Sequence, residues 1–362
     1  MSFLKRLNFS ILLPVIFLVI FSLLTLASLS SSDDRPFQIF KKQVIWFILG
    51  FAIFFVLGNF FDHRILDTQN FFSVAFYAFC LILLILVLIL GVRVRGAAGW
   101  LGFSFFRFQP IELAKLALII LLAKYFATWH IEIWRPQRLF VSALYIGLYF
   151  LLAFLQPDLG SAALLVIIWL GMLLVSGLKF KHFIILFFVG LVLVSIGWQY
   201  LAPFQKDRVV NFFNPGRDPL GTGYSVIQAK IAIGSGGFWG RGLGQGLETQ
   251  LRFLPEAKTD FFLAAFIEEW GFFGGLLLFL VFGWFIFQLM NIGLRAQDNF
   301  SRLFVFGYLL LTVSQIFINF GANLGFLPVT GLPLPLLSYG GSNLLINFTA
   351  LGIIQSIKLR ST

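Results

Sequence analysis

The side chain with the strongest case for chemistry is Asp260, the last residue of the polar stretch Leu254–Asp260. Glu256 and Lys258 precede it, and an apolar run begins directly after it, at Phe261. A carboxylate at the boundary between water and an apolar region can act as a general base toward a hydroxyl group. Burial beside phenylalanine strengthens such a base, whereas the N-terminus of a helix weakens it. The alternative is that Asp260 only caps the helix that follows.

A second group of charged residues lies earlier in the chain. Glu112 and Lys115 are three residues apart, which puts them on one face of a helix and within pairing reach. Asp158, in a short turn, lies where it could also reach Lys115. Two interpretations stay open. The residues form a structural ion pair or triad, or Lys115 neutralises a substrate phosphate.

The long polar segment 202–259 combines glycine with basic and aromatic residues. Three apolar residues at helical spacing predict a short amphipathic helix over 223–233 that lies on the membrane surface. The glycine-rich part, 234–242, is either a flexible linker or a place where backbone approaches a ligand closely. Its neighbourhood favours an anionic headgroup, because it contains the basic residues Arg208, Arg241 and Arg252.

A second irregular stretch, Gly331–Ser342, contains two hydroxyl side chains that we predict to contact substrate, Ser338 and Ser342. Ser342 could instead cap the next helix. Non-helical backbone at membrane depth must be covered by protein or line a wet cavity. A structural plug that re-enters the membrane is therefore the competing interpretation.

Composition decides what kind of protein presents these residues. Of 362 residues, 59% are hydrophobic and only 11% are charged, and the apolar runs are continuous rather than alternating. This excludes a β-barrel and predicts an all-α polytopic membrane protein, with one integral membrane domain over residues 1–362. The net charge of +11 is attributed to topology anchors and anionic membrane lipids, not to nucleic acid. The lone Cys80 excludes a disulfide framework.

The apolar runs predict about ten membrane spans, so that both termini lie on one side. The spans are expected at about 9–29, 43–61, 70–90, 110–127, 139–155, 160–177, 182–201, 261–290, 303–322 and 342–357. Loops on the side of the termini carry about 12 Lys and Arg, against about 6 in the short opposite loops, which places both termini in the cytoplasm. The large loop, about 202–260, then faces outward. Glu268 and Glu269 fall inside a span, which marks a function or a buried pair.

Four motifs resemble the SEDS family (shape, elongation, division and sporulation), in its RodA-like branch. They are Gln109–Lys115 (Q-P-x-E-x-x-K), Gln156–Gly160 (Q-P-D-L-G), Leu254–Phe261 (L-P-E-x-x-T-D-F) and Gly331–Ser342 (G-x-P-L-P-x-x-S-Y-G-G-S). Two positions depart from the family pattern. Gly99 stands before Trp100 where a basic residue is usual, and Lys258 stands where histidine is usual.

The resemblance implies a peptidoglycan glycosyltransferase in the bacterial cytoplasmic membrane, active during cell elongation. Such enzymes join lipid II units at the outer membrane face and release undecaprenyl pyrophosphate. The resemblance makes Asp260 the general base and implies a class B penicillin-binding protein as partner.

The leaving pyrophosphate needs positive charge, from side chains or from a divalent cation such as Mg²⁺ or Mn²⁺. The predicted substrate-binding residues are Lys115, Arg208, Arg241 and Lys258, with Glu112, Asp158, Ser338 and Ser342. A flippase for lipid-linked precursors and a non-catalytic scaffold are the competing functions.

Overall fold

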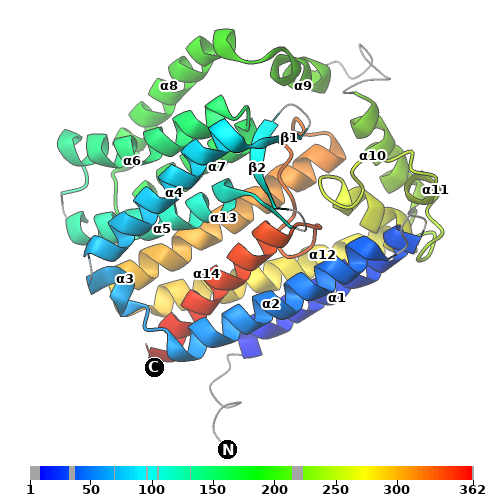
Figure 1. Cartoon of the computed structure of the whole chain (residues 1–362), viewed down its shortest axis with the longest axis horizontal. Helices are drawn as coiled ribbons and strands as arrows, with labels where there is room; N and C mark the ends of the chain where they lie inside the picture. Colours follow the sequence, from blue (N-terminus) through cyan, green and yellow to red (C-terminus); the bar gives the residue numbers. More distant parts are fainter. Residues whose placement is uncertain are drawn as a thin grey trace, which may run out of the picture. The chain divides into compact units, whose positions relative to one another are not determined.

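The computed structural model describes residues 9–31, 37–68, 70–94, 97–103, 106–130, 132–213 and 223–360. Over these residues most of the chain is helical (Figure 1). The long helices are α1 (Phe9–Ser31), α2 (Gln38–Phe60), α4 (Asn70–Leu90), α5 (Pro110–Trp129), α6 (Pro136–Leu155), α7 (Leu159–Val175), α8 (Phe180–Gly197), α12 (Phe262–Arg295), α13 (Asn299–Leu324) and α14 (Gly341–Arg360). Each predicted span coincides with one of them, and the all-α prediction is confirmed.

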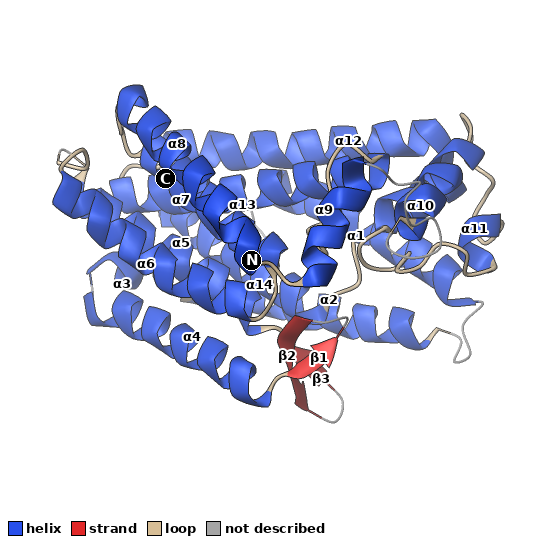
Figure 2. Ribbon diagram, turned by 90° about the horizontal axis from the view of Figure 1, so that it is seen from above, coloured by secondary structure: helices blue, strands red, loops and turns tan. Residues whose placement is uncertain are grey.

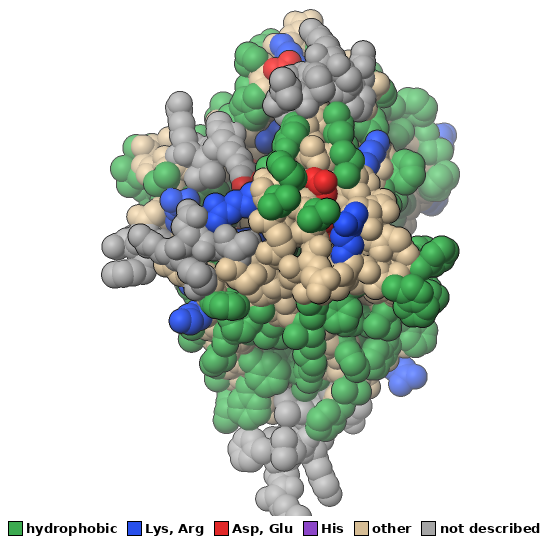
Figure 3. Space-filling model, turned by 90° about the vertical axis from the view of Figure 1, so that its right-hand side faces the viewer, with side chains coloured by type: hydrophobic (Ala, Val, Ile, Leu, Met, Phe, Trp, Pro, Cys, Tyr) green, Lys and Arg blue, Asp and Glu red, His purple; other side chains and the backbone are tan. Residues whose placement is uncertain are grey.

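Length and hydropathy identify membrane helices among these elements. Within the described residues, 7 helices are long and apolar enough to cross a membrane, namely α1, α2, α4, α6, α8, α12 and α13. Helix α7 is apolar but shorter, and α5 carries Glu112, Lys115 and Lys124. On the face drawn in Figure 3, the lower half is mostly hydrophobic, whereas most charged side chains lie in the upper half among other residues. The chain is a multi-pass membrane protein.

The predicted loop 91–108 contains a small antiparallel sheet (Figure 2). Its strands are β1 (Val92–Val94), β2 (Ala97–Phe103) and β3 (Phe106–Phe108), paired in the order β1-β2-β3. In the register, Leu101 lies opposite Phe108 and Phe103 opposite Phe106. Strands this short are difficult to predict because glycine and arginine interrupt the alternation of apolar residues.

The predicted outer loop contains three helices, α9 (Pro203–Phe213), α10 (Tyr224–Ser235) and α11 (Leu247–Gln250). Residues 214–222 of that loop lie outside the described residues. The remaining short elements are α3 (Arg64–Thr68) and the 3₁₀ helix η2 (Trp198–Tyr200). The predicted amphipathic helix therefore exists as α10.

The chain divides into two compact units, which we describe separately. The first comprises Met1–Ile53, Asp207–Gln288 and Val313–Phe348; the second comprises Phe54–Lys206, Leu289–Thr312 and Thr349–Thr362. A single integral membrane domain over 1–362 stays a prediction.

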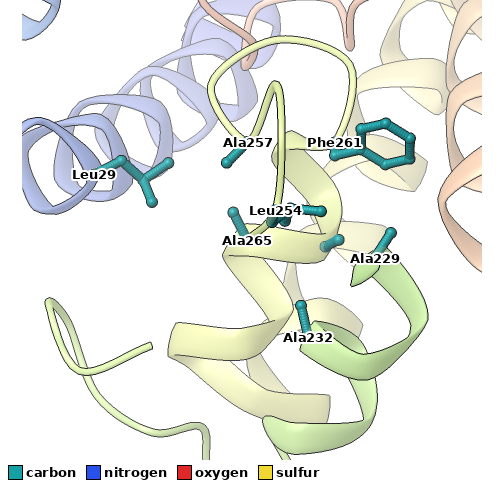
Figure 4. Close-up of a cluster of buried hydrophobic side chains, with 8 residues drawn as sticks. Leu29, Ala229, Ala232, Leu254, Ala257, Phe261 and Ala265 are labelled. Atoms are coloured by element: carbon teal, nitrogen blue, oxygen red, sulfur yellow. The ribbon is translucent and has the colours of Figure 1, made fainter. Parts of the chain in front are cut away.

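In the first unit, small side chains allow helix α10 to pack on the start of α12 (Figure 4). The buried cluster consists of Leu29, Ala229, Ala232, Leu254, Ala257, Phe261, Ala264 and Ala265. The buried face of α10 is therefore its alanine face. The apolar residues Tyr224, Ile227 and Ile231 lie outside this buried face, and Ile231 is exposed. That α10 lies on the membrane surface stays a prediction.

In the second unit, polar side chains are paired inside a helix bundle. The Tyr149 hydroxyl donates to the Tyr77 carbonyl at 2.8 Å, and the Tyr77 hydroxyl donates to the Tyr145 carbonyl at 2.7 Å. The Tyr77 and Tyr149 rings stack with centroids 4.4 Å apart. The Gln156 amide donates to the Leu84 carbonyl at 3.0 Å. Such pairing is required because an unpaired polar group in an apolar interior is costly.

His63 connects the turn after α2 to the end of α14 in the second unit. The Ser356 hydroxyl donates to the Phe61 carbonyl at 2.8 Å and lies 3.3 Å from Nδ1 of His63. Burial lowers the pKa of His63; Asp298 and Asp62 oppose this shift, whereas Arg360 and Arg64 reinforce it.

We expect the free energy of unfolding to fall at acidic pH because of His63. Because the folded pKa of His63 is lowered, the unfolded state binds more protons below its pKa of about 6.5, and stability falls as the pH drops below that value. The loss is at most about 1.4 kcal/mol per pH unit. Thermal unfolding in detergent at pH 7.5 and 5.5 tests this, with His63→Gln as the non-titrating control. An equal acid-induced loss in His63→Gln would contradict the assignment.

Candidate active site

Asp260 lies at the end of a tightly turned loop between α11 and α12. Glu256 sits in the left-handed region with φ of 55°, and its carbonyl accepts the N–H groups of Thr259 at 3.0 Å and Phe261 at 3.1 Å. The Thr259 hydroxyl donates to the Glu256 carboxylate at 2.7 Å. The buried side chains of Leu254 and Ala257 anchor the loop. The loop therefore has a defined conformation up to Asp260.

The backbone of Asp260 is held from α13. Its carbonyl accepts hydrogen bonds from the side-chain amides of Asn319 and Asn323, each at 3.0 Å. Helix α12 begins at Phe262, and the first-turn N–H of Ala264 is accepted by Asn323 at 3.1 Å. Asp260 is half-buried, and its carboxylate lies near Gly331. A Cβ at Gly331 would lie 4.0 Å from Oδ2 of Asp260.

The stretch Gly331–Ser342 is hydrogen-bonded to the loop that precedes Asp260. The Ser338 hydroxyl donates to the Thr259 carbonyl at 2.6 Å and accepts the Leu334 N–H at 3.0 Å. The Tyr339 N–H donates to the Lys258 carbonyl at 2.9 Å. These contacts give Ser338 a structural role in holding the backbone beside Asp260; a contact with substrate stays a prediction.

Ser338→Ala is expected to destabilise the protein by about 1–3 kcal/mol, because the buried Leu334 N–H and the partly buried Thr259 carbonyl lose their partner. Thermal unfolding of the purified protein measures the effect. Unchanged stability combined with weaker substrate binding would contradict the structural role and favour direct substrate contact.

A cavity of about 430 Å³ opens beside the loop, in the size range of small-molecule sites. Its wall contains two cationic side chains, Arg252 and Lys258, and the carboxylate of Glu256. Thr259, the residue before Asp260, also lines it. The rest of the wall is formed by Leu29, Ile39, Thr249, Leu254, Pro255, Ala257 and Tyr339. This mixture suits an anionic group attached to an apolar one.

Glu268 and Glu269 are both buried, and their carboxylates accept hydrogen bonds from backbone N–H groups of residues 244–249. Glu268 accepts the N–H groups of Glu248 at 2.9 Å and Thr249 at 3.2 Å. Glu269 accepts the Gly244 N–H at 3.2 Å and the hydroxyl of Ser28. Burial raises the pKa of Glu248, the Glu268 charge adds to this shift, and Arg241 opposes it. The two glutamates are structural in these contacts.

The glycine-rich segment 234–242 inserts its backbone into a break in α12. The break is at Gly271, whose φ of 69° and ψ of −169° are not helical. The Phe272 and Phe273 N–H groups donate to the carbonyls of residues 237 and 238, at 2.9 and 3.2 Å. The Glu268 and Glu269 carbonyls accept the N–H groups of residues 241 and 242, at 2.9 and 3.0 Å. The flexible-linker interpretation is wrong, because this backbone replaces helical hydrogen bonds.

The remaining predicted residues of the first unit, Arg208, Arg241 and Ser342, lie in different surroundings. Arg241 is exposed, and its Nε donates to the Ser235 carbonyl at 3.2 Å. Arg208 lines a second cavity, of about 30 Å³, together with Lys230 and Asn211. Ser342 is buried in the first turn of α14, which begins at Gly341. Of the predicted residues, Lys258 and Ser338 thus belong to the surroundings of Asp260.

The other three predicted residues belong to the second unit. Lys115 donates to the Glu112 carboxylate at 2.7 Å, and the two side chains are only 0% and 4% exposed. The Asp158 carboxylate accepts the Ser161 N–H at 3.0 Å and so caps α7. The predicted pair is present, and the contact that the structure gives Asp158 is this cap rather than Lys115.

Arg252 was expected only as one of three basic residues suited to an anionic headgroup. Three further residues near Asp260 were not among the predicted ones, namely Asn319, Asn323 and Tyr339. A signal existed for the first two, because two amides four residues apart in an apolar helix must find partners. Within the described residues, no three His, Cys, Asp or Glu side chains come together as a metal donor set. The divalent cation therefore stays a prediction, and no step below is routed through it.

Comparison with known proteins connects this site to a family. The model of the FtsW, RodA and SpoVE family, described as cell cycle protein, matches residues 4–362. The chain belongs to this family. Stage V sporulation protein E of Bacillus subtilis is 37% identical over 330 residues, 90% of this chain and 88% of that protein. Peptidoglycan glycosyltransferase MrdB of Escherichia coli K12 is 34% identical over 349 residues, 95% and 92% of the two chains.

Solved structures of the FtsW, RodA and SpoVE family agree with the fold. A chain of a peptidoglycan synthase complex that coordinates polymerization and crosslinking matches with a TM-score of 0.83, 33% identity and 98% coverage of each chain. RodA of Thermus thermophilus matches with a TM-score of 0.72, 28% identity and coverage of 97% and 96%. The resemblance inferred from the four motifs is confirmed, and with it an enzyme of the glycosyltransferase class.

Proposed function

We propose that the chain polymerises lipid II into glycan strands, with Asp260 as the general base. The observation that carries the proposal is the placement of Asp260. Its backbone is fixed by Asn319 and Asn323, and the two residues before it line a cavity with cationic and apolar walls. The name of the relative MrdB, a peptidoglycan glycosyltransferase, supports the same reaction.

The proposed step is a substitution at the anomeric carbon of the donor. The Asp260 carboxylate accepts the proton of a sugar hydroxyl on the acceptor while that oxygen forms the new glycosidic bond. The bond between the anomeric carbon and the pyrophosphate oxygen breaks, and its electron pair leaves with undecaprenyl pyrophosphate. The proton then passes from Asp260 to solvent, which restores the base.

Positive charge near the leaving group stabilises the transition state. We assign Arg252 and Lys258 to this role, because both line the cavity next to the Asp260 loop. The apolar side chains in the same wall suit the start of the lipid chain. Arg208, Arg241 and Lys115 remain proposed contacts for the diphosphate or for other parts of the substrate, as do Glu112, Asp158, Ser338 and Ser342.

We further propose that both termini face the cytoplasm and that loop 202–260 faces outward from the bacterial cytoplasmic membrane. The distribution of Lys and Arg among the loops supports this orientation. A class B penicillin-binding protein is the proposed partner. Its support is the likeness of the chain to the synthase complex that couples polymerization with crosslinking.

Two other functions compete with this proposal, a flippase and a scaffold. A transporter is expected to hold its charged site near the middle of the membrane, between broken helices. Broken helix α12 fits that description, but Glu268 and Glu269 beside its break already accept backbone N–H groups. This observation favours the enzyme.

The test is to supply labelled lipid II to the purified chain in proteoliposomes and to measure glycan polymer, undecaprenyl pyrophosphate and lipid II translocation. We expect polymer, with one undecaprenyl pyrophosphate released per glycosidic bond. Translocation without polymer would overturn the proposal in favour of the flippase. Absence of both polymer and translocation would overturn it in favour of the scaffold.

A further inference from the structure

Two asparagines of α13 form a buried amide pair in an otherwise apolar part of the helix. Asn319 and Asn323 are four residues apart, hence on one face, and are 3% and 0% exposed. Nδ2 of Asn323 lies 2.9 Å from the carbonyl oxygen of Asn319 and 3.0 Å from its Oδ1, and these two acceptors share the two N–H groups of Asn323 with the Asp260 carbonyl. Burying two amides is costly unless their hydrogen bonds are made, so the partners of this pair indicate what it does.

Asn319 joins the two backbone segments that flank the Asp260 carboxylate. Its Nδ2 donates to the Asp260 carbonyl at 3.0 Å and to the Leu332 carbonyl at 2.8 Å. A side-chain amide has two N–H donors, and both are used here. Leu332 follows Gly331, which lies near the Asp260 carboxylate. One amide therefore sets the spacing between the base and the segment opposite it.

Asn323 fixes the same point relative to α12. Its Oδ1 accepts the Ala264 N–H at 3.1 Å, and its Nδ2 donates to the Asp260 carbonyl at 3.0 Å. The side chain thus connects the carbonyl of Asp260 with the first turn of the helix that follows. Rotation or translation of the loop against α12 would break one of these bonds.

We propose that Asn319 and Asn323 are positioning residues that hold the Asp260 carboxylate in its reactive geometry. This inference rests on the proposed function, because it requires Asp260 to act as the base. Packing of two helices requires only apolar side chains. Asn319 and Asn323 instead make four hydrogen bonds to backbone groups at Asp260, Ala264 and Leu332. A displacement of about 1 Å at a reacting group reduces a rate on the order of 10²-fold.

The experiment compares Asn319→Ala and Asn323→Asp with a matched control on α14. Asn323→Asp keeps an acceptor for the Ala264 N–H but loses the donor to the Asp260 carbonyl. The control is Asn347→Ala, because Nδ2 of Asn347 donates to the carbonyl and Oδ1 of Asn343 at 2.8 and 3.0 Å, the same pairing between residues four apart. Glycan polymerisation from lipid II gives kcat and KM, and thermal unfolding in detergent gives stability.

We expect kcat to fall on the order of 10²-fold in Asn319→Ala and Asn323→Asp, with KM within about threefold of wild type. Asn347→Ala should lose comparable stability and keep its kcat. Where Asn319→Ala or Asn323→Asp does not fold, Asn319→Ser, which introduces no buried charge, carries the test.

Three outcomes would overturn the inference. They are full activity of the two α13 variants, a rise in KM at unchanged kcat, and a loss of activity that follows lost stability equally in Asn347→Ala. Asp260→Asn in the same assay distinguishes failure of the positioning role from failure of the proposed base. If Asp260→Asn is inactive and the α13 variants are active, only the positioning role fails. If Asp260→Asn is active, the proposed base fails as well.

Discussion

Replacing Glu112 with leucine is expected to destabilise the protein by about 3–5 kcal/mol, because it leaves the Lys115 ammonium buried without its carboxylate. The two groups are 2.7 Å apart and almost fully buried. Replacing both partners by apolar residues of similar volume removes the unpaired charge. Glu112→Leu/Lys115→Met should therefore recover most of the lost stability. Thermal unfolding in detergent gives the comparison.

The chain provides a matched exposed pair for this experiment. Arg135 and Glu132 are also three residues apart and 2.9 Å apart, but 52% and 33% exposed. Glu132→Gln should cost less than about 1 kcal/mol, because exposed ion pairs contribute little. An equal loss in Glu132→Gln and Glu112→Leu would contradict the account of the buried pair.

The double variant also decides between the two interpretations of Lys115. If Glu112 and Lys115 are only a structural pair, the folded Glu112→Leu/Lys115→Met protein keeps its polymerase activity. If Lys115 neutralises the substrate diphosphate, the same protein is stable and inactive.

Gly271→Ala is expected to prevent accumulation of folded protein. Its φ of 69° and ψ of −169° belong to a region that is open essentially only to glycine. A Cβ there would lie 2.2 Å from the backbone nitrogen of Gly240 and 2.6 Å from the carbonyl oxygen of Phe238. Those atoms belong to the segment that replaces the helical hydrogen bonds of α12, so neither side can move away. Folded yield from size-exclusion chromatography measures the effect.

The control for this substitution lies in the same helix. Gly283 has open space where a Cβ would be, so Gly283→Ala should fold at least as well as wild type, since alanine favours helix over glycine. Normal folding of Gly271→Ala would contradict the role of the break.

Local patterns predicted those parts of the molecule that depend on nearby residues. Apolar run lengths predicted the helices because a membrane requires long apolar segments. The spacing of Glu112 and Lys115 predicted their pairing, since residues three apart share a helix face. Two charges within an apolar run, Glu268 and Glu269, indicated a function or a buried pair. In the structure their carboxylates accept backbone N–H groups instead.

Other features depend on contacts between residues distant in sequence, and local patterns could not predict them. The insertion of 234–242 into α12 requires that two segments meet at Gly271. The partners of Asn319 lie in two separate stretches, at Asp260 and Leu332. The buried face of α10 consists of alanines, which carry little hydrophobic signal although they allow the closest packing.

The central claim is that the Asp260 carboxylate is the base for glycosidic bond formation. The most direct measurement is the single-turnover rate of polymer formation from bound lipid II, for wild type and Asp260→Asn, with lipid II binding measured on the same samples. We predict equal binding and a rate reduced by a factor of about 10²–10⁴ in Asp260→Asn, the usual contribution of a general base. A wild-type rate in Asp260→Asn at equal lipid II occupancy would contradict the account.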